Sequence, residues 1–259
     1  MVGPMISCLM VTQEGRLPSL ERSIADFARQ TERDRELVVV HDGGAAFHDR
    51  VRAVAQASAG ASIRVVRVRA SPRPSLGALR NVAVDCARGE YVCQWDDDDR
   101  HHPRRLEVQM EVLRAERSDG SVLADQLHLF AEAREMYWDD WDTQPYPLDF
   151  VPGTLLARRE AIARYPDQAR GEDTTLALSM VGAGRRFARI REQGYLYVYV
   201  FDGRNSFDHA HHAAISLYRR FDGARLARLE PALRRHVAEY APPLGRFTMP
   251  HEGGKLEFG

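Results

Sequence analysis

The stretch at positions 89–99, Gly-Glu-Tyr-Val-Cys-Gln-Trp-Asp-Asp-Asp-Asp, joins a short apolar segment directly to four acidic residues. Tyr91, Val92 and Trp95 predict a buried strand, and ligands of an open α/β sheet bind beyond the carboxyl ends of its strands. Adjacent carboxylates repel one another unless a cation lies among them, and their oxygens suit Mg²⁺ or Mn²⁺. A solvated acidic turn before the helix that starts near Pro103 is the alternative, and this stretch alone does not decide between them.

Strands and helices alternate on the N-terminal side of this stretch. Three further apolar runs of strand length precede it, and segments with apolar residues at helical spacing separate these runs. The four predicted strands are Ile6–Val11, Glu36–Val40, Ile63–Val68 and Tyr91–Trp95. This βαβ spacing predicts an α/β fold with a mostly parallel, doubly wound sheet flanked by helices. Residues 1–100 are therefore predicted to form a nucleotide-binding half.

The remainder of the chain is predicted to contain further strands, a short helix and a helical C-terminal extension. The predicted elements are the strands Ser121–Phe130, Glu135–Trp138, Gly153–Leu156 and Leu196–Phe201 and the short helix Glu160–Tyr165. From Ala213 the sequence favours one or two arginine-rich helices and then a proline- and glycine-rich tail that is expected to fray. The predicted main domain thus covers residues 1–212, and the extension covers residues 213–259.

The segment Tyr137–Phe150 interleaves aromatic residues with aspartates and two prolines. Aromatic rings stack on the C–H faces of sugars, and carboxylates accept hydrogen bonds from sugar hydroxyls. This pattern makes Trp138 and Trp141 candidates for binding an acceptor sugar. A proline-rich loop that only covers the core is an equally good interpretation of the same residues.

The overall composition excludes several classes of protein. The net charge of −1 gives no general attraction to nucleic acid or to an anionic membrane. The three cysteines, Cys8, Cys86 and Cys93, form no C-x-x-C pair, so they indicate neither a disulfide framework nor a zinc site. No window approaches the ~20 apolar residues of a transmembrane helix. These features predict a reduced, cytoplasmic protein, with peripheral attachment to a membrane left open.

Five short motifs, taken in their order along the chain, resemble those of the family 2 glycosyltransferases, which have the GT-A fold. They are Thr12 after the first strand, Asp42-Gly43 after the second, Gly77-Ala-Leu-Arg80-Asn81, the D-x-D motif Asp96-Asp97-Asp98, and Glu172-Asp173. The resemblance extends from about Ile6 to about His209. One position differs, because this chain has His41-Asp42 where many members have two aspartates. Of these two residues, Asp42 is the better candidate for binding the nucleobase of the donor.

The resemblance implies an inverting transfer of a sugar from a nucleotide diphosphate, with UDP favoured, to an acceptor hydroxyl. Residues 1–100 would bind the donor, and residues 101–212 the acceptor, which is a glycan, a lipid-linked sugar or another hydroxyl compound. By this resemblance the donor-binding residues are Thr12, Asp42, Arg80, Asn81, Asp96 and Asp97.

The cofactor implied by the resemblance is Mn²⁺ or Mg²⁺, which would stabilise the leaving diphosphate. Asp98 is the first choice of ligand, Asp96 would contact the ribose or the water shell of the metal, and His209 would complete the coordination. The general base would be Asp173, with Glu172 orienting the acceptor. An ordinary aspartate, with a pKa near ~3.9, would be ionised at neutral pH without any adjustment.

Two other functions remain as alternatives. A sugar nucleotidyltransferase also joins a nucleotide-binding half to metal-binding aspartates, but such enzymes usually have a glycine-rich N-terminal loop, and Thr12–Arg16 contains a single glycine. A non-catalytic nucleotide-sugar binding protein is the other alternative, and the presence of both Asp98 and Asp173 argues against it.

Overall fold

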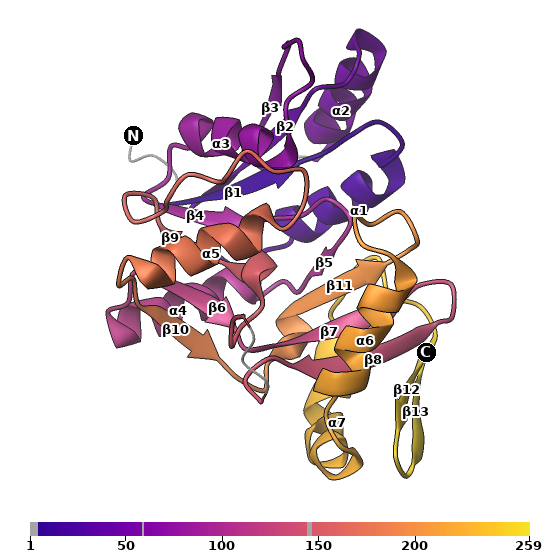
Figure 1. Ribbon diagram of the computed structural model, residues 1–259. Helices are drawn as coiled ribbons and strands as arrows, with labels where there is room; N and C mark the ends of the chain where they lie inside the picture. The colour runs from indigo at the N-terminus through magenta and orange to yellow at the C-terminus, as the bar shows by residue number, and fades with distance from the viewer. Residues whose placement is uncertain (1–4, 59, 144–146) are drawn as a thin grey trace.

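The computed structural model describes residues 5–58, 60–143 and 147–259. Two β-sheets lie side by side, with helices packed against each of them (Figure 1). The first sheet has seven strands in the order β10-β6-β9-β4-β1-β2-β3. Its strands are β1 (Ile6–Val11), β2 (Arg35–His41), β3 (Ile63–Arg67), β4 (Tyr91–Gln94), β6 (Gly120–Leu123), β9 (Leu156–Arg158) and β10 (Phe187–Ile190).

This sheet is parallel except for β9, which runs antiparallel to both β4 and β6. The helices that pack on the sheet are α1 (Leu17–Ala28), α2 (Ala45–Ala57), α3 (Leu76–Cys86), α4 (Arg105–Glu116) and α5 (Glu172–Gly182). One face of β1 packs against α1, α2 and α4, and the other face of the sheet packs against α3. Burial on both faces explains why the centres of β1 and β2, Cys8–Val11 and Leu37–Val40, are continuous apolar runs and not alternating ones. The predicted doubly wound α/β fold is therefore confirmed.

The second sheet has six strands in the order β13-β12-β8-β7-β11-β5. Its strands are β5 (Arg100–His101), β7 (Asp125–Phe130), β8 (Glu135–Asp140), β11 (Tyr197–Phe201), β12 (Phe247–His251) and β13 (Gly254–Phe258). Two helices, α6 (His209–Arg219) and α7 (Gly223–Val237), accompany this sheet, and α6 lies across it in Figure 1. Two short 3₁₀ helices, Pro152–Thr154 and Gly194–Leu196, precede β9 and β11.

The C-terminal part differs from the predicted extension. Helices α6 and α7 are present, but the tail forms the hairpin β12–β13, and β12 pairs with β8 at Thr248. One hydrophobic core joins residues on both sides of the predicted boundary at 212, including Trp138 and Phe221, whose rings stack at 5.0 Å. The second sheet thus needs residues 213–259 to complete its core, and the tail does not fray because it is a paired strand.

Two other predicted elements also differ. The predicted strand Ser121–Phe130 divides at Ala124 into β6 and β7, which belong to different sheets. The predicted helix Glu160–Tyr165 is absent, because Tyr165 precedes a proline, which disfavours helical backbone, and its amide donates to the side chain of Asn81 (2.9 Å).

The three cysteines are free thiols. Cys8 in β1 and Cys93 in β4 are register partners on neighbouring parallel strands, and both are fully buried. Cys86, at the end of α3, is half-buried. No helix among the residues that the structure describes is long and apolar enough to cross a membrane.

Candidate active site

A cleft of ≈310 Å³ opens at the carboxyl ends of β1, β2 and β4. Thr12 follows β1 directly, Asp42 follows β2, and the acidic run begins two residues after β4. The opposite wall comes from the first turn of α5 and from the segment 205–207. The predicted site residues that line this cleft are Thr12, Asp42, Arg80, Asp96, Asp97, Asp98, Glu172 and Asp173.

Arg16 places a cation among the acidic residues. Its Nη1 donates to Asp97 Oδ1 (2.9 Å) and to Asp98 Oδ2 (2.7 Å), so one guanidinium nitrogen bridges two carboxylates. Nη2 of the same side chain donates to the carbonyl of Arg204 (3.3 Å), and Arg204 in turn donates to the carbonyl of Gly15 (3.3 Å). The loop after β1 is thereby joined to the segment after β11 at the cleft.

Asp96 and Asp99 are held by the protein itself. Asp96 accepts from Arg80 Nη2 at Oδ1 (2.7 Å) and from Gln94 Nε2 at Oδ2 (3.0 Å). Asp99 accepts from the Val200 amide (3.0 Å) and from the Tyr197 hydroxyl, and it is almost fully buried. Both oxygens of Asp96 thus have protein partners, and its contact with the ribose or with the water shell of a metal stays a prediction.

The carboxylates of the run differ in pKa because their partners differ. Burial raises the pKa of Asp98 to about 7, with the neighbouring charge of Asp97 adding to the effect. Burial also raises the pKa of Asp97, against the opposing effect of Arg16. At Asp96 burial is the largest single effect and acts in the same direction, but the charge of Arg80 and the hydrogen bonds from Gln94 and Arg80 together outweigh it, so the pKa is lowered. Asp98 thus combines a raised pKa with a place in the cleft lining and an ion pair to Arg16.

Arg80 connects the two walls of the cleft. It extends from α3, its Nε donates to Glu172 Oε1 (2.7 Å), and its Nη2 donates to Asp96 Oδ1 (2.7 Å). Only 5% of Arg80 is exposed, and its Nη1 has no hydrogen-bond partner among the described residues. A buried donor without a partner is costly, and the oxygens of a bound phosphate would satisfy it.

Asp173 lies beside Glu172 in the first turn of α5, after Gly171, whose φ of 69° is favourable for glycine. Its Oδ1 accepts from the Thr174 amide (2.7 Å), and the residue lines the cleft. Burial, followed by the charge of Glu172, raises the pKa of Asp173 to about 6. The prediction that Asp173 has an ordinary aspartate pKa is therefore wrong.

Asp42 is paired in the structure with Arg73, whose Nη2 donates to Oδ1 (3.1 Å) while its Nε contacts Oδ2. The Arg73 side chain is largely exposed, at 70%, so it can move without disturbing the core. His41, the residue where the family motif differs, lies inside the strand and contacts His48 Nδ1 through Nε2 (3.0 Å). Asp42 thus faces the cleft and His41 does not.

Asn81 does not line the cleft. Its Nδ2 donates to the Tyr165 carbonyl (2.8 Å), and its Oδ1 accepts from the Tyr165 amide (2.9 Å). The side chain is therefore used to position Tyr165, whose ring packs 5.7 Å from the Arg80 guanidinium. The predicted donor contact of Asn81 is replaced by this supporting role.

The predicted metal ligand His209 also lies elsewhere. It is the first residue of α6, is exposed, and lines a second pocket beside the rings of Phe130 and Phe201. His209 is absent from the lining of the acidic cleft, so the structure does not bring it to Asp98.

The predicted acceptor tryptophans do not meet the cleft either. Trp138 is 1% exposed, and its Nε1 donates to Asp125 Oδ1 (2.7 Å). Trp141 packs under the Arg219 guanidinium, 4.3 Å from its ring centroid. β8 directs Trp138 into the core of the second sheet, and Trp141 packs beside a separate core cluster. Positions 144–146 of the same predicted loop lie outside the described residues.

Several cleft residues were not identified from the sequence. They are Gln13, Arg16, Arg73, Arg170, Tyr199 and the segment 205–207. Arg16 lies five residues beyond the end of β1, and this closeness to a strand end is a local signal that could have placed it at the cleft. Tyr199 and 205–207 come from the second half of the chain, and only the sheet order brings them to the acidic run.

The sheet and the acidic cleft at its carboxyl edge define a class of protein, the α/β folds that bind nucleotides at this edge. Residues 7–153, which are more than half of the chain, match the family described as glycosyl transferase family 2. The chain therefore belongs to glycosyl transferase family 2, and the resemblance found in its motifs is confirmed.

Curated relatives match shorter segments. A cholesterol galactosyltransferase of Borreliella burgdorferi is 28% identical over 112 residues, which are 43% of this chain and 30% of the relative. An uncharacterised glycosyltransferase of Methanocaldococcus jannaschii is 28% identical over 110 residues, which are 42% of this chain and 37% of the relative. The matched segments thus span about a third of these relatives.

Solved structures of similar fold cover nearly the whole chain. The mannosyltransferase PcManGT of Pyrobaculum calidifontis, in complex with GDP-Man and Mn²⁺, has a TM-score of 0.59 at 16% identity, covering 93% of this chain and 74% of that one. TarS 1–349 of S. aureus has a TM-score of 0.55 at 14% identity, covering 91% and 80%. These similarities establish the GT-A fold of the chain.

Proposed function

We propose that this protein is an inverting glycosyltransferase that moves a sugar from a nucleotide diphosphate, with UDP favoured, to an acceptor hydroxyl. One observation carries the proposal: a single cleft is lined by Asp98 at the strand ends, here called the donor wall, and by Asp173 in α5, here called the facing wall. Arg80 joins the two walls by its bonds to Asp96 and Glu172. Proteins of similar fold bind UDP, UDP-GlcNAc and GDP-Man, which supports a nucleotide-sugar donor.

The donor wall fits a divalent cation. Asp97 and Asp98 already share the positive charge of Arg16, and the buried Asp97 Oδ2 has no hydrogen-bond partner among the described residues. Carboxylate oxygens are the ligands that Mg²⁺ and Mn²⁺ prefer. When bound, the ion would neutralise the charge that gathers on the leaving diphosphate. Asp98 and Asp97 would hold it, and Arg16 would then be free to pair with phosphate oxygens.

The facing wall supplies the base. Asp173 would accept the proton of the acceptor hydroxyl as that oxygen attacks the anomeric carbon, while the diphosphate leaves from the opposite side. A single displacement of this kind inverts the configuration at the anomeric carbon. Glu172 has one oxygen bonded to Arg80, so it would hold Arg80 against the diphosphate and present its other oxygen to the acceptor.

Metal-dependent donor binding tests this proposal. Asp98→Asn removes the charge that would hold the cation and preserves the shape of the side chain. We expect Mn²⁺ and UDP together to raise the melting temperature of the parent, since ~100-fold saturation adds about 2.7 kcal/mol of stability. The same additions should have little effect on Asp98→Asn.

The matched control is Asp142→Asn. Asp142 is an aspartate outside the cleft, paired with Arg191, and its substitution should leave the Mn²⁺-dependent shift unchanged. Equal shifts in the parent and in Asp98→Asn would show that the metal does not bind here. Parallel titrations with UDP and GDP would identify which nucleobase the donor carries.

A further inference from the structure

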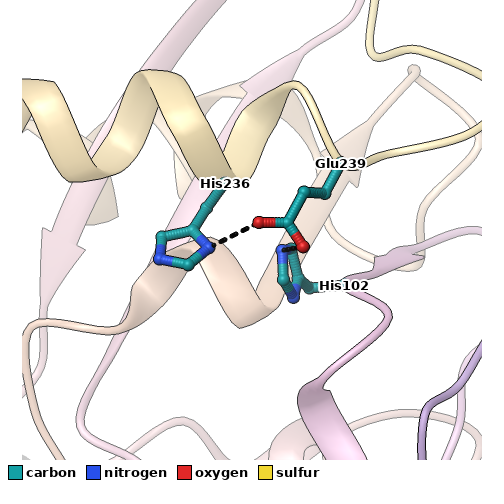
Figure 2. Close-up of side chains that lie close together, drawn as sticks. All are labelled: His102, His236 and Glu239. Atoms are coloured by element: carbon teal, nitrogen blue, oxygen red, sulfur yellow. Dashed lines mark hydrogen bonds and ion pairs between the residues drawn. The ribbon is translucent and has the colours of Figure 1, made fainter.

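Two histidines and a glutamate meet outside the cleft, where the end of α7 contacts the segment between β5 and α4. Both imidazole rings point toward the carboxylate of Glu239 (Figure 2). His236 Nδ1 lies 3.1 Å from Glu239 Oε1, and His102 Nε2 lies 3.5 Å from Glu239 Oε2. One ligand atom from each of the three residues lies within 4.8 Å of the other two. Three side chains that bind metals in proteins are thus already gathered at one point.

His102 is the least satisfied member of this group. It is fully buried, and its Nε2, which faces Glu239, has no hydrogen-bond partner among the residues described. Its other nitrogen, Nδ1, accepts only a long contact from the Arg104 amide (3.2 Å). A buried imidazole nitrogen without a hydrogen-bond partner is costly, and a bound transition metal would satisfy it.

His236 is fixed in orientation. Its ring stacks on Tyr195 with a centroid separation of 3.9 Å and an interplanar angle of 7°. Glu239 is more exposed, which leaves an open side through which an ion and a water molecule can reach the group. The site is thus formed by two rigid rings and one adjustable carboxylate.

We propose that His102, His236 and Glu239 bind a Zn²⁺ ion through His102 Nε2, His236 Nδ1 and a Glu239 oxygen, with water in the fourth position. Two imidazoles and one carboxylate are a known zinc ligand set, and Zn–N distances of ~2.0–2.1 Å place tetrahedral ligand atoms about 3.3 Å apart. The separations of 3.1 Å from His236 Nδ1 to Glu239 Oε1 and of 3.5 Å from His102 Nε2 to Oε2 are close to that spacing. Each is to a different oxygen of Glu239, so the partly exposed carboxylate would turn to place one oxygen on the ion. The cysteine pattern did not indicate this site because it contains no cysteine.

Coordination changes the position of protons in both rings without any redox step. Zinc replaces the proton that His236 Nδ1 shares with Glu239 and the proton on His102 Nε2. Each ring stays neutral by taking a proton from water at its other nitrogen. The Arg104 amide then loses its long contact with His102 Nδ1, and the new Zn–N bond compensates for that loss.

The ion would link the C-terminal end of α7 to the segment between β5 and α4, which follows the acidic run. His102 follows Asp99 by three residues, and its carbonyl accepts from Gln30 Nε2 (2.8 Å) in the segment after α1. The Glu239 carbonyl accepts from Arg29 Nη2 (3.2 Å) in the same region. Zinc bound here would therefore stabilise the junction between the two sheets. This inference is independent of the proposed function.

Zinc titration of the full-length protein tests the inference. The protein is first stripped of metal with a chelator and then titrated calorimetrically with Zn²⁺ in excess Mg²⁺, which occupies carboxylate sites such as the acidic run. We expect one equivalent of Zn²⁺ to bind and to raise the melting temperature. Co²⁺ in place of Zn²⁺ should give the visible absorption of a four-coordinate site.

Glu239→Gln and His236→Gln are the diagnostic variants, because neither side chain is fully buried. The first preserves the shape of the side chain and removes its charge, and the second removes the imidazole nitrogen and leaves a polar side chain. Each should weaken Zn²⁺ binding at least ~10-fold and remove the Co²⁺ absorption. Glu257→Gln is the matched control, since Glu257 is exposed and paired with Lys255. Absence of one-equivalent binding in the parent, or unchanged binding in both diagnostic variants, would overturn the proposal.

Discussion

Identical side chains have different properties in this cleft because their partners differ. Asp96 is bonded to Arg80 and Asp99 to the backbone of β11, whereas Asp97 and Asp98 share one nitrogen of Arg16. The first two carboxylates hold the structure of the run, and the other two are available to a cation. The sequence of four aspartates does not by itself show which of them are structural and which can bind a cation.

Replacement of Asp173 by asparagine separates chemistry from binding. The asparagine would preserve the shape of the side chain but could not accept a proton, and general-base catalysis is worth ~10²–10⁴-fold. We expect sugar transfer by Asp173→Asn at saturating donor to fall at least ~100-fold, while UDP binding in the presence of Mn²⁺ stays near that of the parent. Transfer within a few-fold of the parent would remove Asp173 from the mechanism.

The pH dependence of transfer should reflect the raised pKa of Asp173. A base with a pKa of about 6 is protonated below that pH, so kcat should fall about tenfold per pH unit there. Stability should change in the opposite direction. The folded state binds this proton more tightly than the unfolded chain, so Asp173 contributes more stability as the pH falls from about 6 toward ~4.

This opposition gives a clear control. The melting temperatures of the parent and of Asp173→Asn, measured across the same pH range, isolate this contribution. The parent should gain stability relative to the variant as the pH falls, while its rate of transfer declines. A rate that stays constant down to pH ~4 would contradict the assignment of Asp173 as the base.

At the scale of elements, the position of α3 depends on the glycine at its start. The Gly77 amide donates to the Gln168 carbonyl (3.0 Å), and a Cβ at this position would lie 1.8 Å from the carbonyl oxygen of Pro166. Both partners are backbone atoms that cannot rotate away. Because Arg80 lies one turn further along α3, close packing at Gly77 also sets the position of Arg80.

Gly77→Ala should therefore cost stability, and it should also affect the cleft. Overpacking typically costs about 1–3 kcal/mol, measured as the free energy of unfolding in urea, and the displaced α3 should weaken donor binding. Gly182→Ala is the matched control, because among the described residues no atom beyond its chain neighbours and the backbone of its own helix would lie within 4 Å of the added Cβ, and alanine favours the helix. Similar free energies for both variants would show that α3 adapts freely.

Elements with strong local patterns were predicted correctly from the sequence. Buried strands such as β1 and β2 contain uninterrupted apolar runs, Cys8–Val11 and Leu37–Val40, and α1 and α4 repeat apolar residues at helical spacing. The division of 121–130 between two sheets could not be predicted, because it depends on the Ala124 amide bonding to the carbonyl of Ile190, which is distant in the sequence.

The same reasoning applies to the site. Residues that directly follow strands, such as Thr12, Asp42 and Asp98, could be placed in the cleft because the ends of parallel strands meet at one edge. Trp138 could not be placed, because its face of β8 is covered only when Phe221 and α7 pack against it. Sequence spacing shows which residues follow a strand, but it does not show which distant element covers a given face of that strand.

At the scale of the whole molecule, the two sheets form one cooperative unit with the C-terminal part. Seven buried core residues follow position 212: Phe221, Leu226, Leu233, Tyr240, Phe247, Met249 and Phe258. Burial of such side chains contributes about 1.5–3 kcal/mol each, whereas the net stability of a protein is about 5–15 kcal/mol.

A chain ending at residue 212 should therefore fail to fold as an independent domain. We expect it to be aggregated, or to lack a cooperative thermal transition by circular dichroism, while the full chain unfolds in one step. A melting temperature of the 1–212 fragment within a few degrees of the full chain would restore the domain boundary that the sequence suggested.

The neighbouring thiols of Cys8 and Cys93 make the central strands a natural reporter of global opening. Neither sulfur is exposed, and both belong to strands in the middle of the first sheet, so an alkylating reagent reaches them only when the sheet itself opens. Cys86, at the edge of α3, would react earlier and would mark local fraying. The order of alkylation thus separates the local motion of one helix from global unfolding, and no cysteine has to be introduced.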